Sequence, residues 1–239
     1  MTTINCQPHP IFEKWALELN DIDGGNPEAD IWFCGIEPGG ELPESLECNP
    51  SRCNNSGLPY WNKDFRDQLR NKNLNKWYFE RRVVKLLIAL GKINIPKEKI
   101  NCYILEKLYE KDGICFKLNL YPLNCRRLRE WTSKHRELSG FPNKGDYQHW
   151  CKKNRYPKLA KLWQEYEQPI LICAGKMFWE EFIYAFNGEQ ANQTLNRSLN
   201  TLSLPNSRII LTRHFINLFS KDQYDIRKIY NELKRKKTK

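Results

Sequence analysis

Short apolar runs alternate along this chain with longer segments in which apolar residues recur at the helical period. Four runs are short and rich in β-branched and aromatic residues, which is typical of buried strands. They are Ile31–Cys34, Ile114–Leu118, Ile170–Ala174 and Arg208–Thr212. The helical pattern, with apolar residues three or four positions apart, covers Ile11–Asn20, Trp77–Leu90, Lys97–Leu108, Arg127–Leu138, Tyr147–Tyr166, Lys176–Phe186 and Asp222–Lys234.

The alternation of strands and helices predicts the fold class. It favours parallel strand pairing with helices on both faces of the sheet. We therefore expect an α/β fold, a three-layer α/β/α sandwich around a central four-stranded parallel sheet. No internal repeat or low-complexity linker divides the sequence, so residues 1–239 are predicted to form a single domain with a basic C-terminal helix and tail over 222–239. Pro157 predicts an interruption of the helical segment that contains it.

The segments that follow the predicted strands carry most of the candidate chemistry. Parallel strands end at one edge of a sheet, and open α/β sheets bind ligands just beyond that edge. Glu37, Asn119 and His214 each follow a different strand, so their carboxylate, amide and imidazole groups should converge. A group that orients water, a group that reads the substrate and a donor to the leaving group suit hydrolysis.

Glu37 lies in a Gly-Ile-Glu-Pro-Gly-Gly turn at residues 35–40, the most informative segment of the chain. Pro38 fixes its own φ and favours an extended conformation for Glu37. Glycine lets the backbone pass close to a ligand because no Cβ intrudes. We expect a stiff, narrow ledge with room for no side chain except the Glu37 carboxylate. The alternative is an ordinary turn with an exposed acid.

The charge of the chain favours a polyanionic partner. Thirty-nine Lys and Arg residues against 28 Asp and Glu give a formal net charge of +11 and a pI near 9.2. Such an excess promotes binding to nucleic acid through counterion release. Basic residues are interleaved with aromatic ones, which favours nucleic acid over a membrane surface; two such clusters are Trp77, Tyr78, Arg81 and Arg82, and Arg126, Arg127, Arg129 and Trp131. The alternative is a solvated basic surface.

The composition of the chain and its cysteines further limit the class of protein to which it can belong. The sequence is 40% hydrophobic with 30 aromatic residues (8 Trp, 11 Tyr and 11 Phe), as in a globular protein, and no run approaches the roughly 18 apolar residues of a membrane span. The N-terminus lacks the pattern of a signal peptide, so we expect a cytoplasmic protein. Nine cysteines occur without a C-x-x-C motif or paired histidines, so we expect no metal and no other cofactor. Cys48 and Cys53, the one close pair in the sequence, receive no role.

The motifs at the strand ends resemble those of the uracil-DNA glycosylase superfamily, most closely its single-strand-selective monofunctional and mismatch-specific branches. The resemblance covers roughly residues 28–220. The first family motif, G-x-[D/N]-P-[Y/G], is similar to residues 35–39; a G-x-P-F motif is similar to Gly57-Leu58-Pro59-Tyr60; and N-x-x-P-L matches residues 119–123. The second catalytic motif, H-P-S, is only partly present as His214-Phe215-Ile216.

The resemblance implies a monomeric, monofunctional DNA glycosylase that flips a nucleobase and hydrolyses its N-glycosidic bond, leaving an abasic site. Glu37 would stabilise the oxocarbenium-like sugar and orient water, and His214 would hydrogen-bond the leaving base. Tyr60 would stack on the base and Asn119 would read its edge. Further base-pocket residues would be Gly35, Ile36, Pro38 and Gly39. The expected DNA contacts are Gly175, Lys176, Arg213, Asn217, Leu218 and Phe219, the last two as a possible wedge in the base stack.

Two departures from the family pattern, at Gly39 and at Glu37, bear on substrate and mechanism. Gly39 stands where strict uracil enzymes carry a Tyr that blocks carbon 5 of the pyrimidine, so we expect an open pocket there. Glu37 is one methylene longer than Asp, so its water is expected to sit differently. The motifs contain no Lys, hence the expectation of hydrolysis without a Schiff base. We hypothesise a 5-substituted pyrimidine, such as hydroxymethylated or glucosylated cytosine in phage DNA, removed in phage defence; uracil excision in repair is the alternative.

Other interpretations stay open at the level of single residues and of the whole protein. Asn119 fits a capping or turn residue, Tyr60 a loop anchor, His214 a structural histidine, and Leu218 and Phe219 a hydrophobic core. The whole chain fits a catalytically idle nucleic-acid-binding or inhibitor module. A hydrolase of free nucleosides is a third class, which the net charge of +11 disfavours.

Overall fold

The computed structural model describes residues 7–19, 23–46, 53, 58–70, 77–127, 129–187, 198–204, 207–215 and 220–237. The strands are β1 (Gly24–Gly25), β2 (Ile31–Gly35), β3 (Phe116–Asn119), β4 (Ile170–Ala174), β5 (Thr201–Ser203) and β6 (Ile209–Thr212). The helices are α1 (Pro10–Leu17), α2 (Lys63–Arg70), α3 (Tyr78–Ala89), α4 (Ile100–Glu106), α5 (Ser133–Ser139), α6 (Lys144–Trp150), α7 (Tyr156–Glu165), α8 (Trp179–Asn187) and α9 (Ser220–Lys237). Two short 3₁₀ helices, η3 (Lys97–Lys99) and η5 (Lys176–Phe178), and a π-helical turn, η4 (Cys151–Arg155), complete them.

The strands form a six-stranded mixed sheet in the order β1-β3-β2-β4-β6-β5. The four strands that the apolar runs predict are its centre, and each pairs with its neighbour in parallel. Two short antiparallel strands, β1 and β5, extend the edges, so the sheet differs from the purely parallel four-stranded sheet expected. The α/β class is confirmed.

The edge strand β1 consists of two glycines, which an apolar pattern does not detect. Both have positive φ, +124° at Gly24 and +121° at Gly25. A Cβ on Gly24 would lie 2.1 Å from the carbonyl oxygen of Pro59. Only glycine fits a strand that passes so close to another backbone segment.

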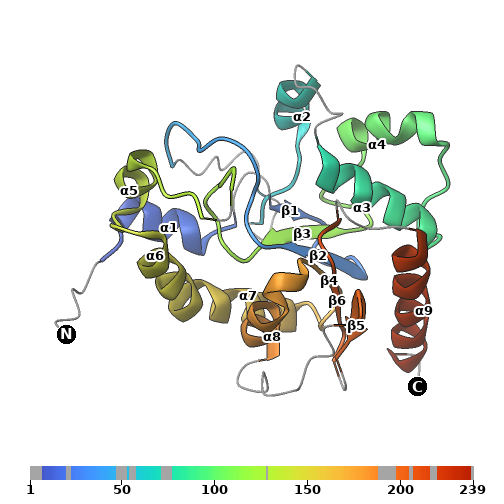
Figure 1. Ribbon diagram of the computed structural model, residues 1–239. Helices are drawn as coiled ribbons and strands as arrows, with labels where there is room; N and C mark the ends of the chain where they lie inside the picture. The colour runs from blue at the N-terminus through green and yellow to red at the C-terminus, as the bar shows by residue number, and fades with distance from the viewer. Residues whose placement is uncertain are drawn as a thin grey trace.

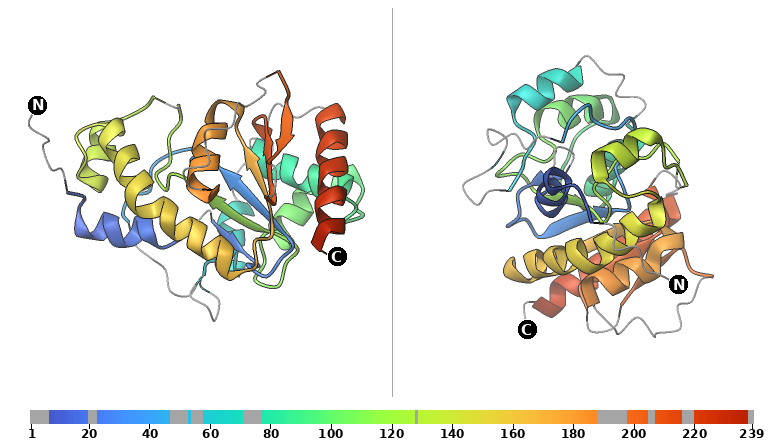
Figure 2. Two further views of the ribbon diagram at one scale, coloured as in Figure 1. Left: turned by 90° about the horizontal axis from the view of Figure 1, so that it is seen from below. Right: turned by 90° about the vertical axis from the view of Figure 1, so that its left-hand side faces the viewer.

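Helices cover both faces of the sheet (Figure 1 and Figure 2). Successive residues of a strand point to opposite faces, so the two hydrophobic clusters divide β2 between them. Trp32 and Cys34 pack in one cluster with residues of α1, α6, α7 and α8. Ile31 and Phe33 pack in the other with residues of α3, α4 and α9. Every residue of β2 and β4 is buried, which explains why these strands are apolar without alternation.

Two helical segments begin or continue differently from their sequence pattern. The predicted segment Arg127–Leu138 starts only at Ser133, because the Thr132 side chain and His135 form a reciprocal capping box there. The expected break at Pro157 is absent, since α6 runs through the π-helical turn η4 into α7. The wider turn just before Pro157 accommodates the missing N–H donor. Within the described residues, no helix combines the length and apolarity needed to span a membrane.

The loops that leave β2 and β3 run side by side. Three backbone hydrogen bonds join them: from the Leu120 amide to the Gly35 carbonyl (3.0 Å), from Tyr121 to Ile36 (2.8 Å) and from Cys125 to Pro38 (3.0 Å). The backbone on both sides of Glu37 is therefore held by the neighbouring loop. Loops tied in this way hold their side chains in place more firmly than free surface loops do.

Candidate functional site

The strand registers bring the candidate residues to one edge of the sheet. Gly35 of β2 lies opposite Asn119 of β3, and Ala174 of β4 lies opposite Thr212 of β6. Because these strands are parallel, the segments carrying Glu37, Asn119 and His214 leave the sheet on the same side. Neighbouring strands lie about 4.8 Å apart, so β3 and β6 are separated by about 14 Å at this edge.

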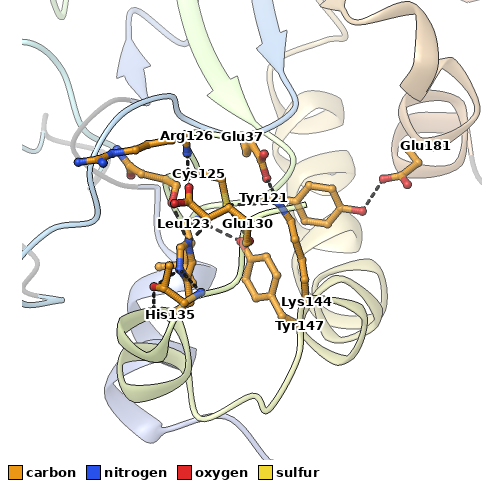
Figure 3. A network of polar contacts seen from close by, with 12 residues as sticks. Glu37, Tyr121, Leu123, Cys125, Arg126, Glu130, His135, Lys144, Tyr147 and Glu181 are labelled. Carbon is orange, nitrogen blue, oxygen red and sulfur yellow. Dashed lines mark hydrogen bonds and ion pairs between the residues drawn. The ribbon is translucent and has the colours of Figure 1, made fainter. Parts of the chain in front are cut away.

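The Glu37 carboxylate is buried and paired with a lysine. Only 7% of the Glu37 side chain is exposed, and its Oε2 accepts a hydrogen bond of 2.8 Å from Nζ of Lys144. The two side chains point toward each other from the loop after β2 and from α6 (Figure 3). Burial raises the pKa of Glu37, and the Lys144 charge opposes that rise. The alternative of an exposed acid on a turn is therefore wrong.

Lys144 is a residue of the site that the sequence motifs miss. It is the first residue of α6, and the Asn143 side chain caps that helix by accepting from the Asp146 amide. Its Nζ lies 3.2 Å from Sγ of Cys125, and only 11% of its side chain is exposed. Since 107 positions separate Lys144 from Glu37, no local motif could reveal the pair. The absence of Lys from the motifs therefore does not mean its absence from the site.

Cys125 and His135 support this pair rather than acting as a nucleophile and base. Nε2 of His135 lies 3.5 Å from Sγ of Cys125 and 3.1 Å from the Asn124 carbonyl oxygen. Nδ1 accepts from the Thr132 amide at 3.1 Å, so Nε2 carries the proton. Burial lowers the pKa of His135 and raises that of Cys125 to about 12. The imidazole is neutral and the thiol is protonated, which removes nucleophilic character.

Asn119 is buried at the end of β3, with 2% of its surface exposed. Its Nδ2 donates to Oδ1 of Asp23 at 2.7 Å. A Cβ on Gly35 would lie 2.4 Å from the Asn119 side-chain oxygen, so the glycine makes room for this amide. The contact with an acceptor carboxylate fixes which way the amide points.

Asp23 is held in turn by a buried arginine. Arg155 donates to Oδ2 of Asp23 at 3.1 Å and to the Asn119 carbonyl at 3.0 Å. Burial raises the pKa of Asp23, and the Arg155 charge opposes it. The ion pair keeps the carboxylate in the form that accepts from Asn119.

Phe79, at the start of α3, lies between the ends of β2 and β6. Its Cε2 is 3.8 Å from the place where a Gly35 Cβ would be, and its ring centroid is 6.5 Å from that of His214. Nζ of Lys117 lies 4.9 Å from the Phe79 centroid. His214 is exposed, and partial desolvation lowers the pKa of its imidazole. Phe79 shares the apolar face of its helix with Val83 and Leu86 and packs against the same core cluster, so its spacing identifies it as a core residue and gives no signal of a site.

Tyr60 lies on the segment that packs against β1, where its amide nitrogen is 3.0 Å from the place where a Gly24 Cβ would be. It lines a cavity of about 400 Å³ beside α2 and α4, together with Trp61, Arg66 and Glu110. The carbonyl oxygen of the adjacent Pro59 accepts a hydrogen bond from the amide of Gly25 in β1, the outermost strand on one side of the sheet. Within the described ranges, no hydrogen bond, ion pair or ring contact joins Tyr60 to Glu37 or Asn119. Its stacking role stays a prediction. Phe79 is an aromatic residue that lies, like the Asn119 amide, beside Gly35.

The turn after Pro38 is open, contrary to the expectation of a ledge without room. Pro38 and Ile36 are buried, but Gly39 and Gly40 are exposed. A Cβ on either glycine would meet nothing within 4 Å. Gly40 has a φ of +106°, which favours glycine, whereas Gly39 does not have a positive φ.

Three of the expected DNA contacts lie within the described residues, and three lie outside them. Gly175 has a φ of +147° and packs against Ile36, while Nζ of Lys176 lies 5.8 Å from the Trp179 ring centroid. Nε of Arg213 is 3.7 Å from a carboxylate oxygen of Asp222. Asn217, Leu218 and Phe219, with Gly57 and Ile216 of the motifs, lie outside the described residues.

Comparison with known proteins adds no relative. The sequence matches no protein-family model, and no curated protein matches it either. Across the described ranges, no group of three or more His, Cys, Asp and Glu side chains could hold a metal ion. Inference about function therefore rests on the side chains at the sheet edge and on the charge of the chain.

Proposed function

We propose that the protein is a DNA glycosylase, which flips a nucleobase out of DNA and hydrolyses its N-glycosidic bond to leave an abasic site. One observation carries this proposal. Parallel strands β2, β3 and β6 deliver a carboxylate, an amide and an imidazole to the same edge of the sheet. These are the groups needed to orient water, read a base and assist its departure.

Each side chain has a role in this reaction. The extruded base stacks on the ring of Tyr60 and is read by the amide of Asn119. As the bond between sugar and base breaks, Glu37 stabilises the positive sugar and orients the attacking water. His214 donates a hydrogen bond to the base oxygen as negative charge develops there. Its lowered pKa suits a neutral imidazole that donates N–H.

The contacts of Glu37 support its role. A carboxylate stabilises a cation only while it is ionised, and burial alone opposes ionisation. The 2.8 Å contact with Lys144 favours the ionised form inside a poorly solvated region, where its field acts with little screening. The net charge of +11 supports DNA rather than a free nucleoside as the substrate.

The α/β fold is compatible with the uracil-DNA glycosylase superfamily that the motifs resemble. Three of the four motifs begin at Gly35, Asn119 and His214, at or just after the ends of the parallel strands β2, β3 and β6. The antiparallel edge strands β1 and β5 are additions to that expectation.

We propose a 5-substituted pyrimidine as the substrate, such as hydroxymethylated or glucosylated cytosine in phage DNA, removed in phage defence by a cytoplasmic monomer. The open space at Gly39, where a Cβ meets nothing within 4 Å, supports this choice. Uracil excision in DNA repair is the alternative substrate assignment.

Mass spectrometry of bases released from a panel of DNAs tests the proposal. The panel contains uracil, cytosine, hydroxymethylcytosine and glucosylated hydroxymethylcytosine. We expect release of at least one modified base by the wild type, and a loss of about 10²-fold or more in the rate for Glu37→Gln with DNA binding retained. Glu41→Gln, on the same loop with a 79% exposed side chain, is the matched control and should retain the wild-type rate.

Three outcomes would contradict the proposal. Release of no base by the wild type, with DNA still bound, would identify an idle binding module. Equal rates for wild type and Glu37→Gln would remove Glu37 from the chemistry. Hydrolysis of free nucleosides without action on DNA would identify a small-molecule hydrolase.

A further inference from the structure

Lys144 brings a primary amine into the candidate site from α6. Its Nζ is 2.8 Å from Oε2 of Glu37 and 3.2 Å from Sγ of Cys125, and its side chain is 11% exposed. A lysine this well enclosed next to a carboxylate is more than a surface ion pair, because water screens it little. In hydrolysis of the glycosidic bond, as described above, this amine keeps Glu37 ionised but forms no bond to the substrate.

We propose that Lys144 gives the protein a second activity: cleavage of the DNA strand at the abasic site through an imine. The inference rests on the proposed function, because it takes the abasic product as its substrate. The geometry points to it. A carboxylate that orients water against the C1′ atom of the sugar lies within about one hydrogen bond of that water. Because Nζ is 2.8 Å from the same carboxylate, it lies no more than about 9 Å from C1′ when these contact distances are added. Rotation of the flexible four-carbon side chain of lysine shortens that distance.

The surroundings of Lys144 supply the proton acceptor that an amine nucleophile needs. The ammonium form donates directly to Glu37, so one proton can pass from Nζ to Oε2 without solvent. Burial raises the pKa of Glu37, which favours its acceptance of that proton. The nearby Cys125 thiol has a pKa of about 12, so it stays protonated and does not compete for the aldehyde.

The reaction needs no co-reactant, because the water lost when the imine forms is taken up again when the imine is hydrolysed. The neutral amine adds to the C1′ aldehyde of the ring-opened abasic sugar. The hydroxyl group of the resulting carbinolamine leaves as water with the proton that Glu37 accepted, which forms the protonated imine. Glu37, once deprotonated again, removes a proton from C2′. The bond from C3′ to oxygen then breaks, and the 3′ phosphate leaves with the electron pair. Water hydrolyses the imine, which releases the unsaturated aldehyde and restores Lys144.

Borohydride trapping on preformed abasic DNA tests this inference separately from base release. The full-length chain is mixed with a duplex that contains one abasic site, with and without borohydride. We expect a covalent protein–DNA adduct with borohydride, and a β-elimination product without it. Lys144→Arg keeps a cation beside Glu37 but cannot form this imine. In this variant and in Lys144→Ala, the yields of the adduct and of the β-elimination product should fall by about 10²-fold.

A surface lysine provides the matched control. Lys161, with a side chain 77% exposed, represents the amines outside the site. The Lys161→Ala variant should therefore form the covalent adduct and the β-elimination product at wild-type levels. Denaturant midpoints of all variants separate loss of chemistry from loss of folding. Wild-type levels of adduct in folded Lys144→Arg would overturn the assignment of the amine.

Base release, measured on the same preparations, separates the two proposals. If the wild type releases a base but neither traps nor cuts abasic DNA, the lyase inference is wrong and the glycosylase proposal stands. If it traps and cuts abasic DNA in a Lys144-dependent way but releases no base, the lyase inference stands and the glycosylase proposal is wrong.

Discussion

At the scale of single residues, burying the pair formed by Glu37 and Lys144 costs free energy of folding. Each side chain is at most 11% exposed, and burying two charges costs several kcal/mol each before their attraction is counted. Such a pair adds little net stability compared with apolar side chains of the same volume. Its presence at a sheet edge fits a chemical role better than a stabilising one.

Gly39 controls the width of the site in our proposal, so Gly39→Tyr should narrow it. The backbone at Gly39 does not require glycine, and a Cβ there has no neighbour within 4 Å, so the variant should fold. The ring would then occupy the space meant for a substituent on carbon 5. We expect kcat/KM on glucosylated hydroxymethylcytosine to fall by about 10²-fold, and on uracil by much less.

Gly39→Ala is the control for this change, because it adds one methyl group without filling the space. Steady-state kinetics on oligonucleotides with either base measure all three proteins. Undiminished activity of Gly39→Tyr on the bulky base would show that carbon 5 does not face this turn.

At the scale of elements, Arg155 in η4 joins several of them. Its guanidinium donates to the carbonyls of Leu120 (3.1 Å), Asn119 (3.0 Å), Glu18 (3.3 Å) and Ala16, and to the Asp23 carboxylate (3.1 Å). The end of β3, the end of α1 and the segment before β1 thus share one donor group. Without it, a buried carboxylate and several carbonyls lose their partner.

Arg155→Met should therefore lower the free energy of unfolding by about 3–5 kcal/mol, the range for breaking a buried ion pair by removing one partner. Chemical denaturation measures this change. Lys153→Met, an exposed position of the same segment, is the control and should change stability by less than about 0.5 kcal/mol. Equal effects of the two substitutions would contradict the bridging role of Arg155.

The apolar pattern predicts elements whose own side chains form the core. It fails where backbone geometry determines whether an element forms or where it begins. It finds the central strands because their residues are buried on both faces. It misses β1, which contains no side chain to read. It also misplaces the start of α5, since the Thr132 cap decides that start.

The residues of the candidate site also fall into those that local sequence predicts and those that only the folded structure reveals. Glu37, Asn119 and His214 follow strands, so local motifs and one topological rule predict their common edge. Lys144 and Phe79 reach that edge from α6 and α3, and only the packing of helices against the sheet brings them there. Asp23 is likewise found only through its contact with Asn119.

At the scale of the whole molecule, the charge makes a prediction about affinity. A chain with a net charge of +11 that neutralises DNA phosphates releases counterions, and about three such contacts raise Kd by roughly 40-fold between 50 and 200 mM salt. Fluorescence anisotropy with a labelled duplex measures this dependence. A Kd that does not change with salt would exclude a phosphate-contacting surface and favour a small-molecule substrate.

The hydrogen-bonded loops after β2 and β3 have a consequence for how this protein can diversify. Three amide-to-carbonyl contacts hold the two loops together on either side of Glu37. Deleting one residue between Tyr121 and Cys125 would shift the chain by about 3.3 Å and separate at least one of these partners. New base preferences are therefore more accessible through side-chain replacement at position 39 than through insertion or deletion in either loop.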